Sequence, residues 1–333
     1  MSQSETLFKT VSSFENLYQA FRECSRGKKA KMGYQNYLFA YGEKLKFIEE
    51  ELKATGNFRW YGYREFDVYE PKKRLVMAAP YRDRVVHTAI HRVTFPIVDP
   101  TMGVRTYACR YGLGNQNATL RLLEQLKMMG KNRYCIKLDV KKYFESIPHE
   151  EFIKRFLRML PDRSLDQLIK SLVASHPRYA VIKRGIPIGN LTSQLFANFY
   201  LSSLDRMACD LLEIDFMEDK KEPHAFYIRY MDDMVIIAST KEKAFEVALK
   251  LVKHATEDLG LSIPPEKMVI LGSDPIPFLG FVLNHDGYRT LRRNERRFVK
   301  KMRRVTLRGA KESLKAQMIL SFESWQNLEQ KIN

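Results

Sequence analysis

The chain has 333 residues, of which 45% are hydrophobic and 29% are charged, so it can bury a sizeable core in about two domains. It contains no run of about eighteen apolar residues that could cross a membrane, and its N-terminus lacks the basic start and apolar segment of a secretory signal. Lys and Arg number 56 against 39 Asp and Glu, and this net charge of +17 predicts a polyanionic partner, most often nucleic acid. An acidic membrane surface is the other polyanion, but no basic amphipathic anchor with Trp and Leu on its apolar side is present.

The four cysteines are widely scattered and lack the paired spacing of a zinc site. They are Cys24, Cys109, Cys135 and Cys209. We expect them to be small buried thiols in a reducing compartment, which predicts a cytoplasmic protein with no membrane partner.

The first part of the chain, residues 1–65, is predicted to be a helical extension that becomes irregular at its end. Apolar residues recur at helical spacing over 14–21. They do so again over 37–52, and this second helix is predicted to end before Gly56.

Residues 66–80 have the pattern of a strand, a turn and a second strand. The turn holds Lys72, Lys73 and Arg74, a cluster of cations that suits a triphosphate. The alternative is a basic hairpin tip that is only solvated.

A helix is predicted over 118–129, with Asn117 as its N-cap and Gly130 as its end. An apolar strand follows over 134–140 and carries Asp139 at its end.

A loop rich in Gly and Pro, 184–194, is predicted to lead into a long apolar helix over 195–212. Residues 227–238 then form two runs rich in β-branched and aromatic residues around the acidic pair Asp232 and Asp233. This pattern predicts a β-hairpin with both carboxylates at its turn.

Two adjacent carboxylates are costly to hold together unless a cation lies between them, and Mg²⁺ prefers oxygen ligands. The pair therefore points to a metal site. The alternative is an ordinary solvated hairpin turn, since Asp is a common turn residue.

After the hairpin, one apolar stripe predicts a helix over 244–259, and two more strands are predicted over 264–271 and 278–283. The segment 289–308 is dense in Lys and Arg and has Glu295 as its one acidic residue, which is typical of a helix that lies along a phosphate backbone. The residues expected to bind nucleic acid there are Arg292, Arg293, Arg296, Arg297, Lys300, Lys301, Arg303 and Arg304.

A third carboxylate, Asp139, completes a set with Asp232 and Asp233. Two Mg²⁺ ions about 3.5–4 Å apart need carboxylates shared from different strands, and Val140 could add a backbone carbonyl. One ion activates an attacking hydroxyl and the other neutralises charge on a triphosphate and its leaving pyrophosphate, with Mn²⁺ as the substitute metal. Alone, Asp139 could simply cap a helix. The three carboxylates in a strongly basic chain favour the catalytic interpretation.

Five segments resemble, in order, the motifs of reverse transcriptases, and they span roughly residues 66–285. They are Lys137-Leu-Asp-Val-Lys-Lys-Tyr-Phe144, Arg184-Gly-Ile-Pro-Ile-Gly-Asn-Leu-Thr-Ser-Gln194, Tyr230-Met-Asp-Asp233, Leu259-Gly-Leu-Ser-Ile-Pro-Pro-Glu-Lys267 and Phe278-Leu-Gly-Phe281. One tetrapeptide is a weak signal, whereas five ordered motifs are a strong one.

The resemblance implies an α+β fold of the right-hand polymerase type, with fingers, a palm built on an antiparallel sheet and a short helical thumb. Residues 66–285 would form the fingers and palm, and 286–333 the basic thumb. It implies these nucleotide-binding residues: Lys72, Arg74, Phe144, Ile188, Gly189, Gln194 and Lys267.

Four of these residues receive specific roles from the resemblance. Phe144 would be the aromatic gate that excludes a 2′-OH. Lys72 and Arg74, on the fingers hairpin, would face the triphosphate. Lys267 would contact the triphosphate or protonate the pyrophosphate, although a lysine after two prolines could also be merely exposed.

The pocket motif departs from the usual Gln-Gly-x-x-x-Ser-Pro, because Ile188 and Gln194 stand at its ends. This variant is similar to the reverse transcriptases of diversity-generating retroelements, which copy RNA with errors concentrated at adenines. Ile188 offers only apolar contact, so a mispaired nucleotide leaves fewer polar groups unpaired. The alternatives are another compact prokaryotic enzyme, of retron, intron or defence type, and a catalytically silent RNA-binding scaffold.

As partners, the resemblance implies template RNA, the RNA–DNA heteroduplex, dNTPs and a small basic accessory protein. It implies a bacterial or phage origin.

Overall fold

The computed structural model describes residues 6–28, 30–69, 73–307 and 309–328. The chain forms two compact units, each made of three segments. The first contains Met1–Met102, Val140–Ser203 and Lys253–Ser262, and the second contains Gly103–Asp139, Leu204–Val252 and Ile263–Asn333. The chain passes from one unit to the other between Asp139 and Val140.

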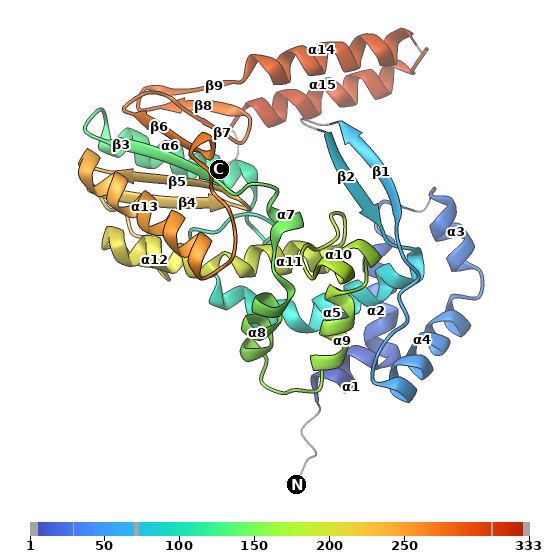
Figure 1. Ribbon diagram of the computed structural model, residues 1–333. Helices are drawn as coiled ribbons and strands as arrows, with labels where there is room; N and C mark the ends of the chain where they lie inside the picture. Colours follow the sequence, from blue (N-terminus) through green and yellow to red (C-terminus); the bar gives the residue numbers. More distant parts are fainter. Residues whose placement is uncertain (1–5, 29, 70–72, 308, 329–333) are drawn as a thin grey trace. The chain divides into compact units, whose positions relative to one another are not determined.

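The first unit is mainly helical and is centred on α5 (Tyr81–Val98), against which α2 and α11 pack (Figure 1). Val85, Val86, Ala89 and Ile90 of α5 are fully buried, which explains why this helix forms the centre of the core. Its other elements are α1 (Leu7–Ser12), α2 (Phe14–Cys24), α3 (Met32–Leu38), α4 (Tyr41–Thr55), β1 (Arg64–Tyr69), β2 (Lys73–Ala78), η1 (Asp99–Thr101), α7 (Tyr143–Ser146), α8 (His149–Met159), α9 (Asp166–Val173), α10 (Pro177–Ile182) and α11 (Leu191–Tyr200).

Two sequence predictions in the first unit need correction. The helix predicted over 37–52 is two helices, because Ala40 has a φ of 58° and ends α3 before α4 begins. The long helix predicted from 195 begins at Leu191 and breaks after Tyr200, so Gln194 lies in the first turn of α11 rather than in a loop. The strand–turn–strand prediction is confirmed by the antiparallel pairing of β1 with β2. Lys72, at its turn, lies outside the described residues.

The second unit is built on an antiparallel sheet with the order β4-β5-β3-β6. Its strands are β3 (Tyr134–Asp139), β4 (Ala225–Tyr230), β5 (Asp233–Ala238) and β6 (Met268–Gly272). The middle of β5, from Met234 to Ile237, is fully buried, which accounts for its unbroken apolar sequence. This sheet confirms the predicted α+β class with an antiparallel sheet.

Helices and a smaller sheet complete the second unit (Figure 1). They are α6 (Asn115–Met129), α12 (Ser202–Leu212), η2 (Pro265–Lys267), β7 (Ile276–Phe278), β8 (Phe281–Asn284), β9 (Gly287–Thr290), α14 (Arg292–Leu307) and α15 (Glu312–Gln326), while α13 (Lys241–Glu257) continues into the first unit. A shared core joins α6 to both sheets through Leu122, Phe226, Ile237, Phe278 and Phe281.

Two further predictions are wrong in detail. Asn117 does not cap α6, which starts at Asn115; its side-chain amide instead donates to the carbonyl of Gly112 at 2.8 Å. The strand predicted over 278–283 is a tight β7–β8 hairpin, because Leu279 and Gly280 both have positive φ.

Among the described helices, none combines the length and the apolar character that a membrane crossing requires. The predicted division into segments 1–65, 66–285 and 286–333 stays a prediction.

Candidate functional site

The acidic pair occupies the turn of the β4–β5 hairpin. Tyr230 pairs with Asp233, so Met231 and Asp232 are the two turn residues. Met231 has a φ of 54°, a left-handed conformation that costs a residue with a side chain about 1–2 kcal/mol. The hairpin predicted from the sequence is confirmed, and its turn is conformationally strained.

The third carboxylate lies beside this turn. Asp139 is the last residue of β3, and it stands directly opposite Asp233 in the β3–β5 pairing. The register of the sheet therefore brings Asp139 and Asp233 to the same end, next to the turn that carries Asp232. The use of these three carboxylates as one metal-binding set stays a prediction.

Two lysines neutralise the carboxylates. Lys137 Nζ lies 2.9 Å from Asp233 Oδ1 and donates to the Pro277 carbonyl at 2.7 Å. Lys267 Nζ donates to Asp139 Oδ2. The Asp233 side chain is 30% exposed, yet its carboxylate is surrounded by protein, and this desolvation raises its pKa above the usual value although Lys137 opposes the shift.

The carboxylates fit a divalent cation by their chemistry. They supply hard oxygen donors at one sheet end, and burial leaves the charge of Asp233 incompletely compensated by Lys137. Among the described residues, no three His, Cys, Asp or Glu side chains lie close enough together to hold a metal ion. In this geometry the ammonium groups of Lys137 and Lys267 supply the positive charge instead. The role of the Val140 backbone carbonyl as a metal ligand stays a prediction.

In the first unit, backbone hydrogen bonds join three predicted nucleotide-binding segments. The Ile186 N–H donates to the Phe144 carbonyl, and the Met77 N–H donates to the Ile188 carbonyl, both at 2.8 Å. These bonds connect α7, the pocket motif and β2, the strand that carries the exposed Arg74.

Gly189 stands where the pocket motif crosses β2. Its φ is 118°, and a Cβ there would lie 3.1 Å from Val76 Cγ1 and 3.3 Å from the Met77 carbonyl oxygen. Both the backbone conformation and the close approach therefore require glycine.

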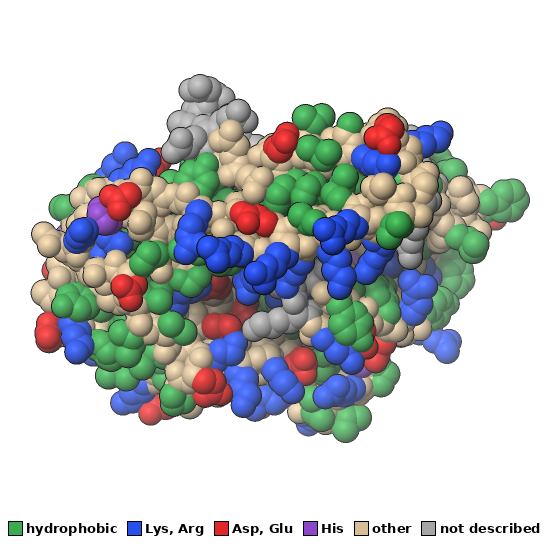
Figure 2. Space-filling model, turned by 90° about the horizontal axis from the view of Figure 1, so that it is seen from above, with side chains coloured by type: hydrophobic (Ala, Val, Ile, Leu, Met, Phe, Trp, Pro, Cys, Tyr) green, Lys and Arg blue, Asp and Glu red, His purple; other side chains and the backbone are tan. Residues whose placement is uncertain are grey.

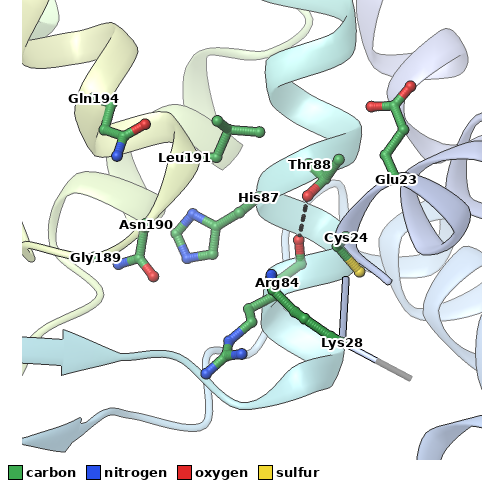
Figure 3. Close-up of a pocket in the computed structure, with 10 residues that line it drawn as sticks. All are labelled: Glu23, Cys24, Lys28, Arg84, His87, Thr88, Gly189, Asn190, Leu191 and Gln194. Atoms are coloured by element: carbon green, nitrogen blue, oxygen red, sulfur yellow. Dashed lines mark hydrogen bonds between the residues drawn. The ribbon is translucent and has the colours of Figure 1, made fainter. Parts of the chain in front are cut away.

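Gln194 lines a polar cavity of about 270 Å³ in the same unit (Figure 3). Asn190, from the same motif, and Arg84 and His87 are among its other lining residues, and neither Arg84 nor His87 was singled out from the sequence. Burial lowers the pKa of His87 to about 3, so its imidazole is neutral, and its Nδ1 lies 2.6 Å from Thr192 Oγ1. Arg84 and His87 were not expected beside the motif, because they come from α5, about a hundred residues earlier in the chain.

A family comparison decides what this site belongs to. Residues 70–283, well over half of the chain, match the family model described as reverse transcriptase (RNA-dependent DNA polymerase). The chain belongs to the reverse transcriptase family. The matched segment contains the three carboxylates and every predicted nucleotide-binding residue.

Individual relatives of this reverse transcriptase come from several sources. It is 28% identical to the Retron Ec73 reverse transcriptase of Escherichia coli, covering 54% of this chain and 57% of the relative. It is 23% identical to the group II intron-encoded protein LtrA of Lactococcus lactis, covering 82% of this chain and 54% of the relative. Apo telomerase from Candida tropicalis is similar with a TM-score of 0.48 and 13% identity, over 72% of this chain and 51% of that chain. The chain spans only 25% to 57% of the length of the first curated relatives it matches.

The basic segment of the reverse transcriptase forms α14, and all eight of its predicted nucleic-acid-binding residues are exposed. The opposite side of α14 packs on α15, where the rings of Phe298 and Phe322 stack 4.0 Å apart. Figure 2 looks onto the side on which α14 lies in Figure 1 and shows Lys and Arg side chains gathered in rows.

The contact between Lys137 and Asp233 was missed from the sequence. A signal was present, because Lys137 and Asp139 are two apart on one strand and therefore point to the same face. The sequence does not tell which strand pairs with β3. In the structure that strand is β5, and its pairing with β3 brings the Lys137 ammonium group to Asp233.

Proposed function

We propose that this reverse transcriptase is an active RNA-directed DNA polymerase that uses Asp139, Asp232 and Asp233 for nucleotidyl transfer. The observation that supports this most is the pairing of Asp139 with Asp233 across β3 and β5, beside the turn of Asp232. Bound Mg²⁺ would lower the pKa of the attacking hydroxyl and neutralise the triphosphate. The chain's own residues hold and orient the reactants around the carboxylates.

Lys267 is suited to a part in the same step. Its ammonium group lies on Asp139, so it would be within reach of a triphosphate that Mg²⁺ binds beside that carboxylate. We propose that Lys267 moves from Asp139 to the triphosphate and donates a proton to the leaving pyrophosphate.

We also propose the diversity-generating retroelement type, with errors concentrated at template adenines. Ile188 is half-buried, and its main-chain carbonyl is fixed by the Met77 N–H. The backbone at this position is thus held from β2, while the side chain offers the nucleotide only apolar contact. A wrong base then leaves no polar group of Ile188 unpaired, which lowers the penalty for mispairing.

The expected partners follow from this type. They are template RNA, its heteroduplex with the cDNA, dNTPs and a small basic accessory protein, in the cytoplasm of a bacterium that carries the element or its phage. The exposed cations of α14 support binding to a polyanion.

The test is primer extension on an RNA template with Mg²⁺ and dNTPs, with and without the accessory protein, followed by sequencing of the cDNA. Errors clustered at template adenines would support the retroelement type. Faithful cDNA would move the chain to the retron or intron type, which the similarity to a retron enzyme and an intron protein favours as the second candidate. RNA binding without incorporation under every condition would favour a silent scaffold.

A further inference from the structure

A buried ion pair lies next to the acidic turn, within the second unit. Arg229 of β4 and Asp205 of α12 are both fully buried. The guanidinium binds the carboxylate with two bonds, from Nε to Oδ1 at 2.6 Å and from Nη2 to Oδ2 at 2.5 Å. This bidentate geometry fixes the orientation of the Arg229 side chain.

Other groups hold the carboxylate in place. Thr106 Oγ1 donates to Asp205 Oδ2 at 2.7 Å, and the Tyr227 hydroxyl donates to Oδ1 at 2.8 Å. Asp205 therefore accepts four hydrogen bonds, which is the full capacity of an ionised carboxylate.

The backbone of Arg229 is held as firmly as its side chain. Its N–H donates to the Arg105 carbonyl at 2.9 Å, and its carbonyl accepts from the Tyr107 N–H at 3.1 Å. The segment 105–107 thus pairs with the edge of β4, and Arg229 is fixed on both sides.

The remaining guanidinium nitrogen contacts the catalytic turn. Arg229 Nη1 donates to the carbonyl of Met231 at 3.0 Å. Met231 is the strained residue that immediately precedes Asp232. A firmly held donor therefore binds the main chain of the turn at the point where its conformation is least favourable.

Stability alone is a poor reason for such a pair. Replacing a buried ion pair by apolar residues of similar size is often neutral or stabilising, because the desolvation of two charges offsets their attraction. The bond to Met231 is the feature that apolar residues could not reproduce.

We propose that Arg229, fixed by Asp205, is a positioning residue that holds the Met231–Asp232 turn in its strained form, so that Asp232 and Asp233 stay aligned with Asp139. This inference rests on the proposed function of the three carboxylates. It adds two residues to the site that do not touch the reacting groups.

The first test replaces the pair in the 333-residue chain by Arg229→Met with Asp205→Leu, which keeps the core filled but removes the donor to Met231. With primer, template and saturating Mg²⁺, we expect kcat to fall about 100-fold, as for a misplacement of about 1 Å, while the KM for template–primer stays unchanged. In the absence of substrate, Mn²⁺ affinity measured by electron paramagnetic resonance should fall about tenfold, as for the loss of a residue that supports metal ligands. The hydroxyls of Thr106 and Tyr227 lose their acceptor in this variant, so the midpoint of thermal unfolding should fall, and kcat is measured at a temperature at which the variant is folded.

A matched control removes a different ion pair of the same unit. Lys250 Nζ lies 2.6 Å from Glu246 Oε1, and both residues belong to α13. Lys250→Met with Glu246→Gln should leave kcat and Mn²⁺ affinity within about twofold, as expected for a site without shared partners.

A second variant keeps the proposal testable if the double variant does not fold. Arg229→Lys keeps a cation beside Asp205, but an ammonium cannot reproduce the fork that reaches both Asp205 and Met231. Arg229→Lys should lower kcat and Mn²⁺ affinity, as the double variant does. Unchanged kcat and Mn²⁺ affinity in a folded variant of either kind would overturn the positioning role. If the unmodified chain binds Mn²⁺ no better than Asp232→Ala, the proposed carboxylate site fails instead.

Discussion

At the scale of single residues, the three carboxylates differ in how protein surrounds them. Asp139 and Asp233 each contact a lysine, from η2 and β3 respectively, while Asp232 is one of the two turn residues. Removing Asp139 or Asp233 would break one of these two ion pairs and so would change more than the metal site. We therefore test the metal chemistry at Asp232.

We expect Asp232→Ala to abolish cDNA synthesis, because two-metal transfer requires every shared carboxylate. RNA affinity should stay nearly intact, since it depends on exposed cations elsewhere. Primer extension and a filter-binding assay measure the two effects. Asp210→Ala, at an exposed position of α12, is the matched control and should retain activity. Polymerisation near the unmodified level in Asp232→Ala would exclude the assignment.

Ile188 is the residue that carries the proposed error spectrum. Ile188→Gln adds an amide at a position whose main chain is already fixed by Met77, so the change is confined to the side chain. We expect misincorporation opposite template adenine to fall more than opposite other bases, because the amide penalises a wrong geometry. Sequencing of the cDNA measures this, with Ile188→Val as the control that keeps an apolar contact. An unchanged adenine spectrum in Ile188→Gln would remove Ile188 from the explanation.

At the scale of elements, the contact between the pocket motif and β2 depends on a glycine. Gly189→Ala combines a φ of 118° with a Cβ 3.3 Å from the Met77 carbonyl oxygen. We expect a loss of about 1–3 kcal/mol in the free energy of unfolding and a higher KM for dNTPs, because β2 must shift away from the motif. Chemical denaturation and steady-state kinetics measure these effects.

Gly62→Ala is the control for this prediction. Gly62 also has a positive φ, of 86°, but a Cβ there meets nothing within 4 Å. Gly62→Ala therefore measures the cost of the backbone conformation alone, without a steric contact of the added Cβ. Equal effects of the two substitutions on stability and on KM would show that the contact with β2 is unimportant.

Sequence reasoning predicted the elements of the site better than their surroundings. Asp139 and the acidic turn were found because strand patterns and a doubled carboxylate are local signals. The break at Ala40 and the start of α6 before Asn117 were missed, because each depends on a backbone conformation that tertiary contacts select. The Arg229–Asp205 ion pair could not be predicted for the same reason, because no local pattern in β4 or α12 indicates which residue on the other element it contacts.

At the scale of the whole molecule, the positive charge is concentrated rather than spread. The net charge is +17, and α14 alone exposes eight predicted nucleic-acid-binding cations on the side away from α15. A helix of this kind binds a backbone by releasing counterions, so its contribution appears in the salt dependence of the affinity.

The triple variant Arg293→Gln, Lys300→Gln, Arg304→Gln tests this role of α14. Each lost phosphate contact should reduce the magnitude of the slope of log affinity against log salt by about 0.7–0.9. The triple variant should therefore reduce that magnitude by about 2–3. The control is Lys154→Gln, Lys170→Gln, Lys253→Gln, which removes the same number of charges from exposed positions on α8, α9 and α13. Heteroduplex affinity measured by fluorescence anisotropy at several salt concentrations compares the two. A similar loss of slope in both variants would mean that the protein attracts nucleic acid through its total charge, whereas a loss confined to the first would assign the backbone contact to α14.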